Sequence, residues 1–142
     1  MAILPPNIRV ANNTKYILCA IRKKWLVLTP EEKVRQYILQ RLMNDQGYPQ
    51  KYISVEKTLK INELSKRYDI VVFNQQLQPK ILIECKAEYI ELKEKTLQQI
   101  ATYNIKLQVP FLMVTNGNSS FHFHIKDETS TQINSFPAFE EL

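Results

Sequence analysis

Glycine is scarce in this sequence, which has 2 glycines against 7 prolines in 142 residues. Glycine-rich phosphate-binding loops need glycine at several fixed positions, because the backbone there approaches the phosphates closely. The sequence contains neither a P-loop nor a dinucleotide-binding fingerprint. A nucleotide-driven motor is therefore not expected in this sequence.

Cysteine and long apolar runs are scarce as well. The 2 cysteines, Cys19 and Cys85, lie far apart and show no metal-ligand spacing, so we expect both thiols to be reduced. No apolar run approaches the length of a membrane span, and no charged-then-apolar signal pattern precedes Cys19. These absences predict a cytoplasmic protein without a membrane partner.

The composition is that of a globular protein, with 44% hydrophobic and 23% charged residues. We expect one domain over residues 1–142, with a core at about 15–126, an irregular lead-in at 1–14 and a polar tail at 127–142. The net charge of +5 favours an anionic partner, although an ordinary solvated surface explains it equally well.

The clearest element boundary is the start of a helix. Thr29 suits an N-cap, Pro30 suits the first helical position, and Glu32 completes a capping box. Apolar spacing predicts that this helix ends by Gly47 and that a second helix covers residues 93–107.

Short apolar or alternating runs predict the strands. An extended segment or hairpin is expected at 16–28, and strands are expected at 51–61, 68–73, 80–87, 111–115 and 121–125. The strands before and after residues 74–79 should pair as an antiparallel hairpin. The order α-β-β-β-α-β-β predicts an α/β fold in which helices flank a central mixed sheet.

The strand at residues 81–86 carries a charged pair that packing alone does not require. Its side chains alternate, so Glu84 and Lys86 share one face while Cys85 lies on the apolar face. Asp69 opens the neighbouring apolar strand. Ionised groups are rarely buried without a partner or a function, so we interpret these charged residues as candidates for catalysis. An ion pair kept for structure is the alternative.

Two carboxylates and a lysine on adjacent strands suit the hydrolysis of a phosphodiester. Mg²⁺ prefers oxygen ligands, keeps several of its waters and takes one or two protein carboxylates. Asp69 and Glu84 can supply these ligands, and the Cys85 carbonyl can supply a third oxygen. Lys86 can hold or deprotonate the attacking water. The sequence therefore predicts a Mg²⁺-dependent nuclease, with Mn²⁺ as a substitute.

The spacing of these residues resembles the motif of PD-(D/E)XK nucleases. More narrowly, the sequence resembles the N-terminal nuclease domain of type I restriction enzyme R subunits, in particular its small standalone relatives. The segments that carry the resemblance, within about residues 15–126, are 28–36 (LTPEEKVRQ), 55–57 (VEK), 68–73 (YDIVVF), 81–87 (ILIECKA) and 115–117 (TNG). The resemblance implies a restriction-endonuclease-like core and endonuclease activity on DNA.

The resemblance also assigns roles to individual residues. It implies that Asp69 and Glu84 are metal ligands and that Lys86 is the catalytic lysine. It further points to an acid on the first helix, for which we choose Glu32 over Glu31. A capping-box glutamate, however, needs no metal to explain it.

A second helix motif and several basic residues complete the candidate set. Gln99 and Tyr103 match a Gln-x-x-x-Tyr motif that in the family orients the active-site lysine or contacts nucleic acid. A solvated helix face with Tyr103 half-buried is the alternative. Arg35 and Lys57 are candidates for a basic rim that binds DNA. One departure from the family pattern is Tyr68, which replaces the proline that precedes the motif's aspartate.

The expected partner is DNA, together with other restriction-modification subunits, and a homo-oligomer is left open. The basic cluster at residues 22–25, which includes Trp25, could contact phosphates or form a solvated turn. The alternative function is a catalytically silent nuclease-fold module that binds DNA within a restriction or repair complex.

Overall fold

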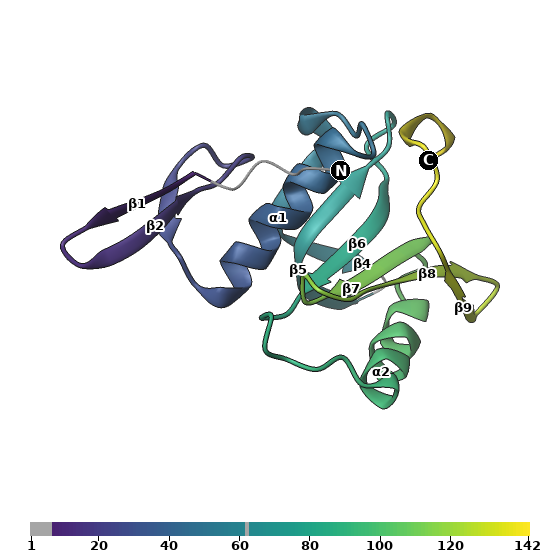
Figure 1. The fold of residues 1–142 in the computed structure, drawn as a ribbon. Coiled ribbons are helices and arrows are strands. Elements are labelled where there is room, and N and C mark those ends of the chain that lie inside the picture. The colour runs from purple at the N-terminus through teal and green to yellow at the C-terminus, as the bar shows by residue number, and fades with distance from the viewer. Residues whose placement is uncertain (1–6, 62) are drawn as a thin grey trace.

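The computed structural model describes residues 7–61 and 63–142, which form two β-sheets and two α-helices (Figure 1). The smaller sheet is antiparallel and contains β1 (Ile8–Ala11), β2 (Thr14–Leu18) and β3 (Trp25–Val27), in that order. Figure 1 shows that the β1–β2 hairpin projects away from the rest of the molecule.

The larger sheet is mixed and carries the candidate residues. Its strands are, in spatial order, β4 (Ile53–Ile61), β5 (Leu64–Phe73), β6 (Pro79–Cys85), β7 (Phe111–Thr115), β8 (Ser120–Lys126) and β9 (Thr129–Ile133). Strands β6 and β7 pair in parallel, and the other neighbours pair antiparallel. The parallel pair follows from the helical crossover between β6 and β7, because parallel strands cannot be joined by a tight hairpin.

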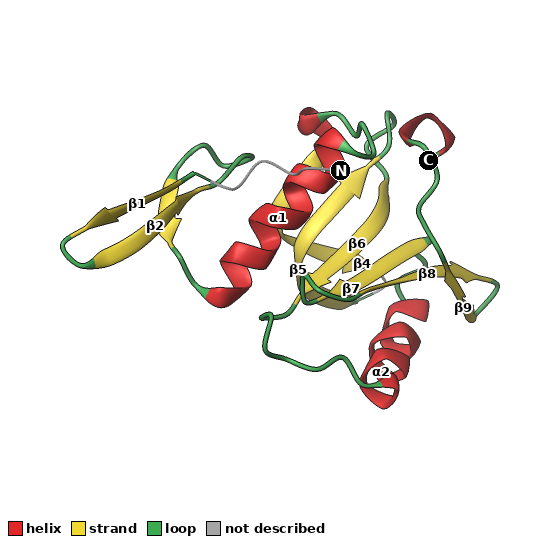
Figure 2. Ribbon diagram, in the orientation of Figure 1, coloured by secondary structure: helices red, strands yellow, loops and turns green. Residues whose placement is uncertain are grey.

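Two helices, α1 (Pro30–Asn44) and α2 (Glu94–Ile105), cover opposite faces of the larger sheet (Figure 2). There are also two short 3-10 helices. The first, η1 (Gln50–Tyr52), lies between α1 and β4, and the second, η2 (Phe139–Glu141), follows β9. The start of α1 confirms the capping prediction, since the Thr29 hydroxyl accepts a hydrogen bond from the Glu32 N–H at 3.1 Å. No helix in residues 7–61 and 63–142 is long and apolar enough to cross a membrane.

Side chains of β6 alternate between the two faces of the sheet, as the sequence predicted. Ile81, Ile83 and Cys85 pack in the apolar core on the α1 side, whereas Leu82 packs in the core on the α2 side. Glu84, two residues after Leu82, therefore leaves β6 on the α2 side.

The C-terminal tail belongs to the core, and the expectation that residues 127–142 form a polar tail outside the core is wrong. Strand β9 pairs with β8, and Phe136 and Phe139 are buried in the α1-side core. The Tyr48 hydroxyl donates a hydrogen bond to the Pro137 carbonyl at 2.6 Å. Burial raises the pKa of Tyr48 to about 12, so its phenol stays protonated and anchors the tail at neutral pH.

The N-terminal segment also departs from expectation, because part of the irregular lead-in expected at 1–14 is a strand. Asn12 and Asn13 have φ of 50° and 62° and form the two-residue turn that joins β1 to β2. Residues 1–6 of the lead-in lie outside the described residues. The hairpin expected at 16–28 is confirmed by the pairing of β2 with β3.

Strand β4 changes the face that it buries halfway along its length. Ile53 packs on the α1 side and Leu59 on the α2 side, although regular alternation would place both on one face. The β4–β5 ladder skips Glu56, whose φ is 54°, and the opposite residue Asp69. Strand β4 therefore does not keep one buried face along its length, and the irregularity lets both Glu56 and Asp69 reach Arg35 of α1.

Candidate active site

Asp69 lies where the β5–β6 ladder opens. The last regular pair is Ile70 with Ile83, so Asp69 and Glu84 occupy the next opposite positions on the two strands. Asp69 Oδ2 accepts a hydrogen bond from the Cys85 N–H at 2.7 Å. The carboxylate therefore takes the place of a ladder partner and lies between the two strands.

Glu84 is paired with a lysine on the α2 side of the sheet. Lys66 Nζ donates to Glu84 Oε1 and lies 5.0 Å from the ring centroids of both Tyr68 and Tyr103. Tyr103 belongs to α2, so Lys66 connects this helix to the acid of β6. The Glu84 side chain is only 12% exposed, so the contact with Lys66 offsets part of the cost of burying a carboxylate.

Tyr68 fixes α2 against the sheet. Burial and the Glu84 carboxylate raise the pKa of Tyr68 well above its usual range, so the phenol remains a donor. Its hydroxyl donates to Asn104 Oδ1 at 2.6 Å, and the Asn104 amide donates to the Ile100 carbonyl at 2.7 Å. This chain of hydrogen bonds holds α2, and with it Tyr103, beside Lys66.

Arg35 links the acids on the α1 side of the sheet. Its guanidinium lies 3.1 Å from Glu32 Oε1, 3.1 Å from Asp69 Oδ1 and 3.4 Å from Glu56 Oε1. The Arg35 side chain is 8% exposed. One buried cation thus neutralises part of the charge of three carboxylates, one of which is the predicted catalytic aspartate.

Glu56 forms ion pairs with three arginines from different parts of the chain. Arg22 lies 2.9 Å, Arg35 3.4 Å and Arg67 2.9 Å from its carboxylate oxygens. Burial opposes the ionisation of Glu56, but Arg35, Arg22 and Arg67 together outweigh burial and lower its pKa. Glu56 is therefore a stable anion within the arginine cluster.

Glu32 is also fully engaged by protein donors. Its Oε1 accepts from Arg22 at 2.8 Å and from Arg35 at 3.1 Å, and its Oε2 accepts from the Gln36 amide at 2.9 Å. In this arrangement Glu32 positions Arg35 and, through it, Asp69. A cation at Glu32 would have to displace one of these donors.

The remaining predicted residues make no side-chain contact with Asp69 or Glu84 among the hydrogen bonds and ion pairs of the described residues. Lys86 directly follows β6, is half-buried, and its N–H donates to the Thr115 carbonyl at 2.7 Å. Gln99 is exposed on α2, one turn before Tyr103. Lys57 is exposed and pairs in register with Tyr68. The structure thus places Asp69 and Glu84 directly across from each other on the neighbouring strands β5 and β6. The side chains of Gln99 and Lys57 lie on the surface.

Sequence reasoning did not predict the pairing of Lys66 with Glu84 or the contact of Glu56 with Arg35. The strand was expected to begin at Tyr68, where the apolar run begins, so Lys66 fell outside it. In the structure β5 begins at Leu64 and includes Lys66. Glu56 lies in a segment that resembles the family, which was the available signal. Its contact with the cluster depends on the irregularity in β4, which composition does not reveal.

The six-stranded mixed sheet with a helix on each face defines an α/β domain with a restriction-endonuclease-like fold. Residues 30–137 match the family described as "Type I restriction enzyme R protein N terminus", and the chain belongs to that family. The match reaches into the C-terminal tail and excludes β1, β2 and β3, whereas the sequence resemblance covers about 15–126.

Two solved structures share the fold. One is a fragment described as an HsdR subunit of a type I restriction enzyme from Vibrio vulnificus YJ016, with a TM-score of 0.58 and 19% identity over 81% of this chain. This chain covers 24% of that one. The other is described as a nuclease belonging to DUF820 from Anabaena variabilis ATCC 29413, with a TM-score of 0.52 and 11% identity over 100% of this chain and 88% of that one. No curated protein matches the sequence.

Proposed function

We propose that this chain is a Mg²⁺-dependent DNA endonuclease domain that hydrolyses phosphodiesters at the opened end of the β5–β6 ladder. The proposal depends on one observation: Asp69 and Glu84 lie directly across from each other on β5 and β6, one position beyond the Ile70–Ile83 pair. Family membership and the nuclease neighbour support a nuclease-type function.

The oxygen donors at this position fit a hard cation. Among the residues that the structure describes, no three His, Cys, Asp or Glu side chains gather as a metal-binding group. Mg²⁺ does not need such a group, because one or two carboxylates and several waters suffice. Asp69 and Glu84 would supply the carboxylates. Burial and the Asp69 carboxylate raise the pKa of the Cys85 thiol well above its usual range, so only the Cys85 carbonyl is offered as a ligand.

The direction of the Cys85 carbonyl suits a ligand of a cation between β5 and β6. In a strand the N–H and C=O of one residue point toward the same neighbouring strand, and the Cys85 N–H points at Asp69. The carbonyl therefore faces the same opening between β5 and β6. Mg²⁺ bound there would neutralise charge on the phosphate and lower the pKa of a coordinated water.

The protein side chains have separate tasks in the proposed reaction. Lys86 holds the attacking water, which gives up a proton to solvent as its oxygen bonds to phosphorus. One P–O ester bond breaks, and the departing oxygen takes up a proton from solvent. Arg35 and Lys66 balance the charges of Asp69 and Glu84 when no cation is bound. The Cys85 N–H keeps Asp69 oriented in either state.

Nicking of supercoiled plasmid tests this function, with Mg²⁺ or Mn²⁺ as the only divalent cation. Asp69→Asn, Glu84→Gln and Lys86→Gln should each reduce cleavage by at least about a hundredfold, in line with the usual contribution of a catalytic acid or base. Glu91→Gln and Lys93→Gln are matched controls, because this exposed pair has the same spacing as Glu84 and Lys86. Equal activity in the two sets of variants would remove the proposed residues from the mechanism.

A catalytically silent DNA-binding module is the second candidate. The observation that favours it is that both acids already have protein cations, Asp69 with Arg35 and Glu84 with Lys66. This candidate predicts that wild-type protein binds DNA but nicks it with neither Mg²⁺ nor Mn²⁺. Metal-dependent nicking that is lost in Glu84→Gln excludes it.

We further propose that the chain works in the cytoplasm with DNA and other restriction-modification subunits. This assignment is based on the family match. Size-exclusion chromatography with light scattering, on the protein alone and mixed with candidate subunits, measures both self-association and subunit binding. A monomer that binds none of the subunits at micromolar concentration would contradict the assignment.

A further inference from the structure

The net charge of the protein originates at its N-terminus. Residues 1–30 contain 5 lysines and arginines and no acidic residue. The rest of the chain contains 14 lysines and arginines and 14 acids, so the net charge of +5 equals that of this segment. The structure assembles residues 8–27 of this segment into the three-stranded sheet β1–β2–β3 (Figure 1).

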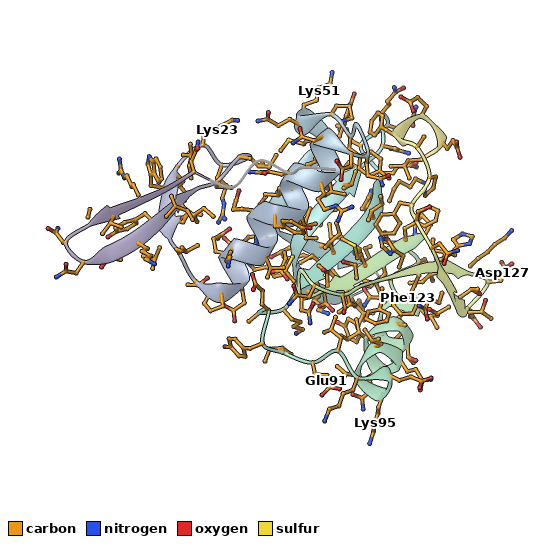
Figure 3. The ribbon with its side chains drawn as sticks, in the orientation of Figure 1. Lys23, Lys51, Glu91, Lys95, Phe123 and Asp127 are labelled. Atoms are coloured by element: carbon orange, nitrogen blue, oxygen red, sulfur yellow. The ribbon has the colours of Figure 1, made fainter. Side chains whose placement is uncertain are left out.

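Four cations of this sheet are available to a ligand. Arg9, Lys15, Lys23 and Lys24 are exposed, and none of them takes part in an ion pair among the described residues. Figure 3 shows that the Lys23 side chain lies at the outer surface of the β2–β3 connection. Because no acid neutralises these cations locally, they create a positive potential along the projecting sheet.

The positive charges lie on both faces of the β1–β2 ribbon. Arg9 is opposite Tyr16 and Lys15 is opposite Val10, so alternation places the two cations on different faces. The Arg9 guanidinium lies 4.3 Å from the ring centroid of Trp25, which keeps it on the Tyr16 face. A two-stranded ribbon fits the major groove of duplex DNA, where phosphates flank it on both sides.

The sheet is fixed to the nuclease fold at the acid cluster. Arg22, in the β2–β3 connection, bonds Glu32 at 2.8 Å and Glu56 at 2.9 Å. The Ala20 N–H donates to the Gln36 side chain at 3.0 Å. Because Arg35 joins Glu32 and Glu56 to Asp69, one network connects the projecting sheet to the candidate active site.

We propose that the sheet of residues 8–27 is a DNA-binding arm that grips the backbone of duplex DNA and brings it to the site. The proposal deepens the function proposed above and rests on it for the choice of nucleic acid. The arm lies outside residues 30–137, which match the family. The family match therefore assigns no role to the arm.

Two matched triple variants test the arm. The first is Lys15→Gln, Lys23→Gln and Lys24→Gln, and the second changes three exposed lysines elsewhere, Lys51→Gln, Lys93→Gln and Lys126→Gln. Both triples lower the net charge from +5 to +2, so a difference between them reports location rather than total charge. Thermal melting checks that both remain folded.

Binding is measured by fluorescence anisotropy with a labelled duplex of about 30 bp in EDTA, so that cleavage does not contribute. At about 0.1 M salt the arm triple should weaken binding at least about tenfold. It should also reduce the slope of log K against log salt by about 0.9 for each phosphate that the arm no longer neutralises. The control triple should change binding less than about threefold. Equal weakening of binding in the two triples would overturn the proposal.

Further outcomes distinguish DNA binding by the arm from binding to other anionic ligands and from the proposed hydrolysis. Undetectable duplex binding by the wild type at low salt, or tighter binding to single-stranded RNA or to phosphatidylserine vesicles than to duplex DNA, would also overturn it. Wild-type protein that binds duplex through the arm but never nicks plasmid would contradict only the proposed hydrolysis. An arm triple that nicks at saturating protein concentration would support separate roles for arm and site.

Discussion

Replacing Arg35 by methionine should strongly destabilise the fold. Methionine keeps an unbranched apolar side chain but removes the cation that contacts Glu32, Glu56 and Asp69 at 3.1–3.4 Å. Removing one partner of a buried ion pair typically costs about 3–5 kcal/mol. Asp69 and Glu56 are 29% and 34% exposed, so water screens part of the repulsion among the acids. We therefore expect a decrease in stability of about 3 kcal/mol, at the lower end of that range.

Urea and thermal denaturation measure this decrease directly. For a domain of this size about 3 kcal/mol corresponds to a decrease in Tm of about 10 °C. Arg41→Met is a matched control, because Arg41 is 51% exposed and pairs with Asp45, the C-cap of the same helix, and with no other acid of the described residues. A surface pair contributes less than about 1 kcal/mol. Similar destabilisation of the two variants would refute the idea that Arg35 holds the acid cluster together.

The destabilisation should also depend on pH and on divalent cations. Because the arginines lower the pKa of Glu56 in the folded state, the stability they provide is present above the pKa of an unfolded glutamate and is lost as pH falls through the folded value. The difference between wild type and Arg35→Met should therefore shrink below about pH 4. If the acids can hold a cation, Ca²⁺ should raise the Tm of Arg35→Met more than that of the wild type.

Three further predictions concern the tail and the lysine beside the site. Phe139→Ala, at a side chain that is 6% exposed, should cost about 3 kcal/mol in urea denaturation, and a change below about 1 kcal/mol would show that the tail is not part of the core. Since burial raises the pKa of Tyr48 to about 12, wild-type stability should fall as pH rises from about 10 to 12, and Tyr48→Phe should fall less; parallel curves would contradict this. Tyr103→Leu removes one ring beside Lys66, so Lys66 should release Glu84 to a cation more readily and half-maximal nicking should need less Mg²⁺; an unchanged Mg²⁺ requirement would separate Tyr103 from the site.

Local signals in the sequence predicted the elements well. The capping box at Thr29 and Glu32 depends on residues three apart, so a short window of sequence contains it. Alternation in β6 likewise predicts the faces of Leu82 and Cys85, because each strand residue turns opposite to its neighbour. Burial of Phe139 was missed because it depends on packing against residues far away in the chain.

The site was predicted less completely than the fold. Asp69 and Glu84 stood out because acids are costly within apolar strands, and the structure places them opposite each other. Lys66 and Glu56 did not stand out, since each lies in a polar stretch where a charge needs no explanation. Their roles follow from tertiary contacts, namely the approach of Lys66 to Glu84 and of Arg35 to Glu56.

The most direct test of the central claim is a crystal structure of the protein soaked in Mn²⁺, with anomalous scattering used to locate the metal. The proposal predicts one strong anomalous peak about 2.1 Å from carboxylate oxygens of both Asp69 and Glu84, with the Cys85 carbonyl nearby and Lys66 turned away from Glu84. Intact Asp69–Arg35 and Glu84–Lys66 pairs with no anomalous peak between the two acids, at millimolar Mn²⁺, would contradict it.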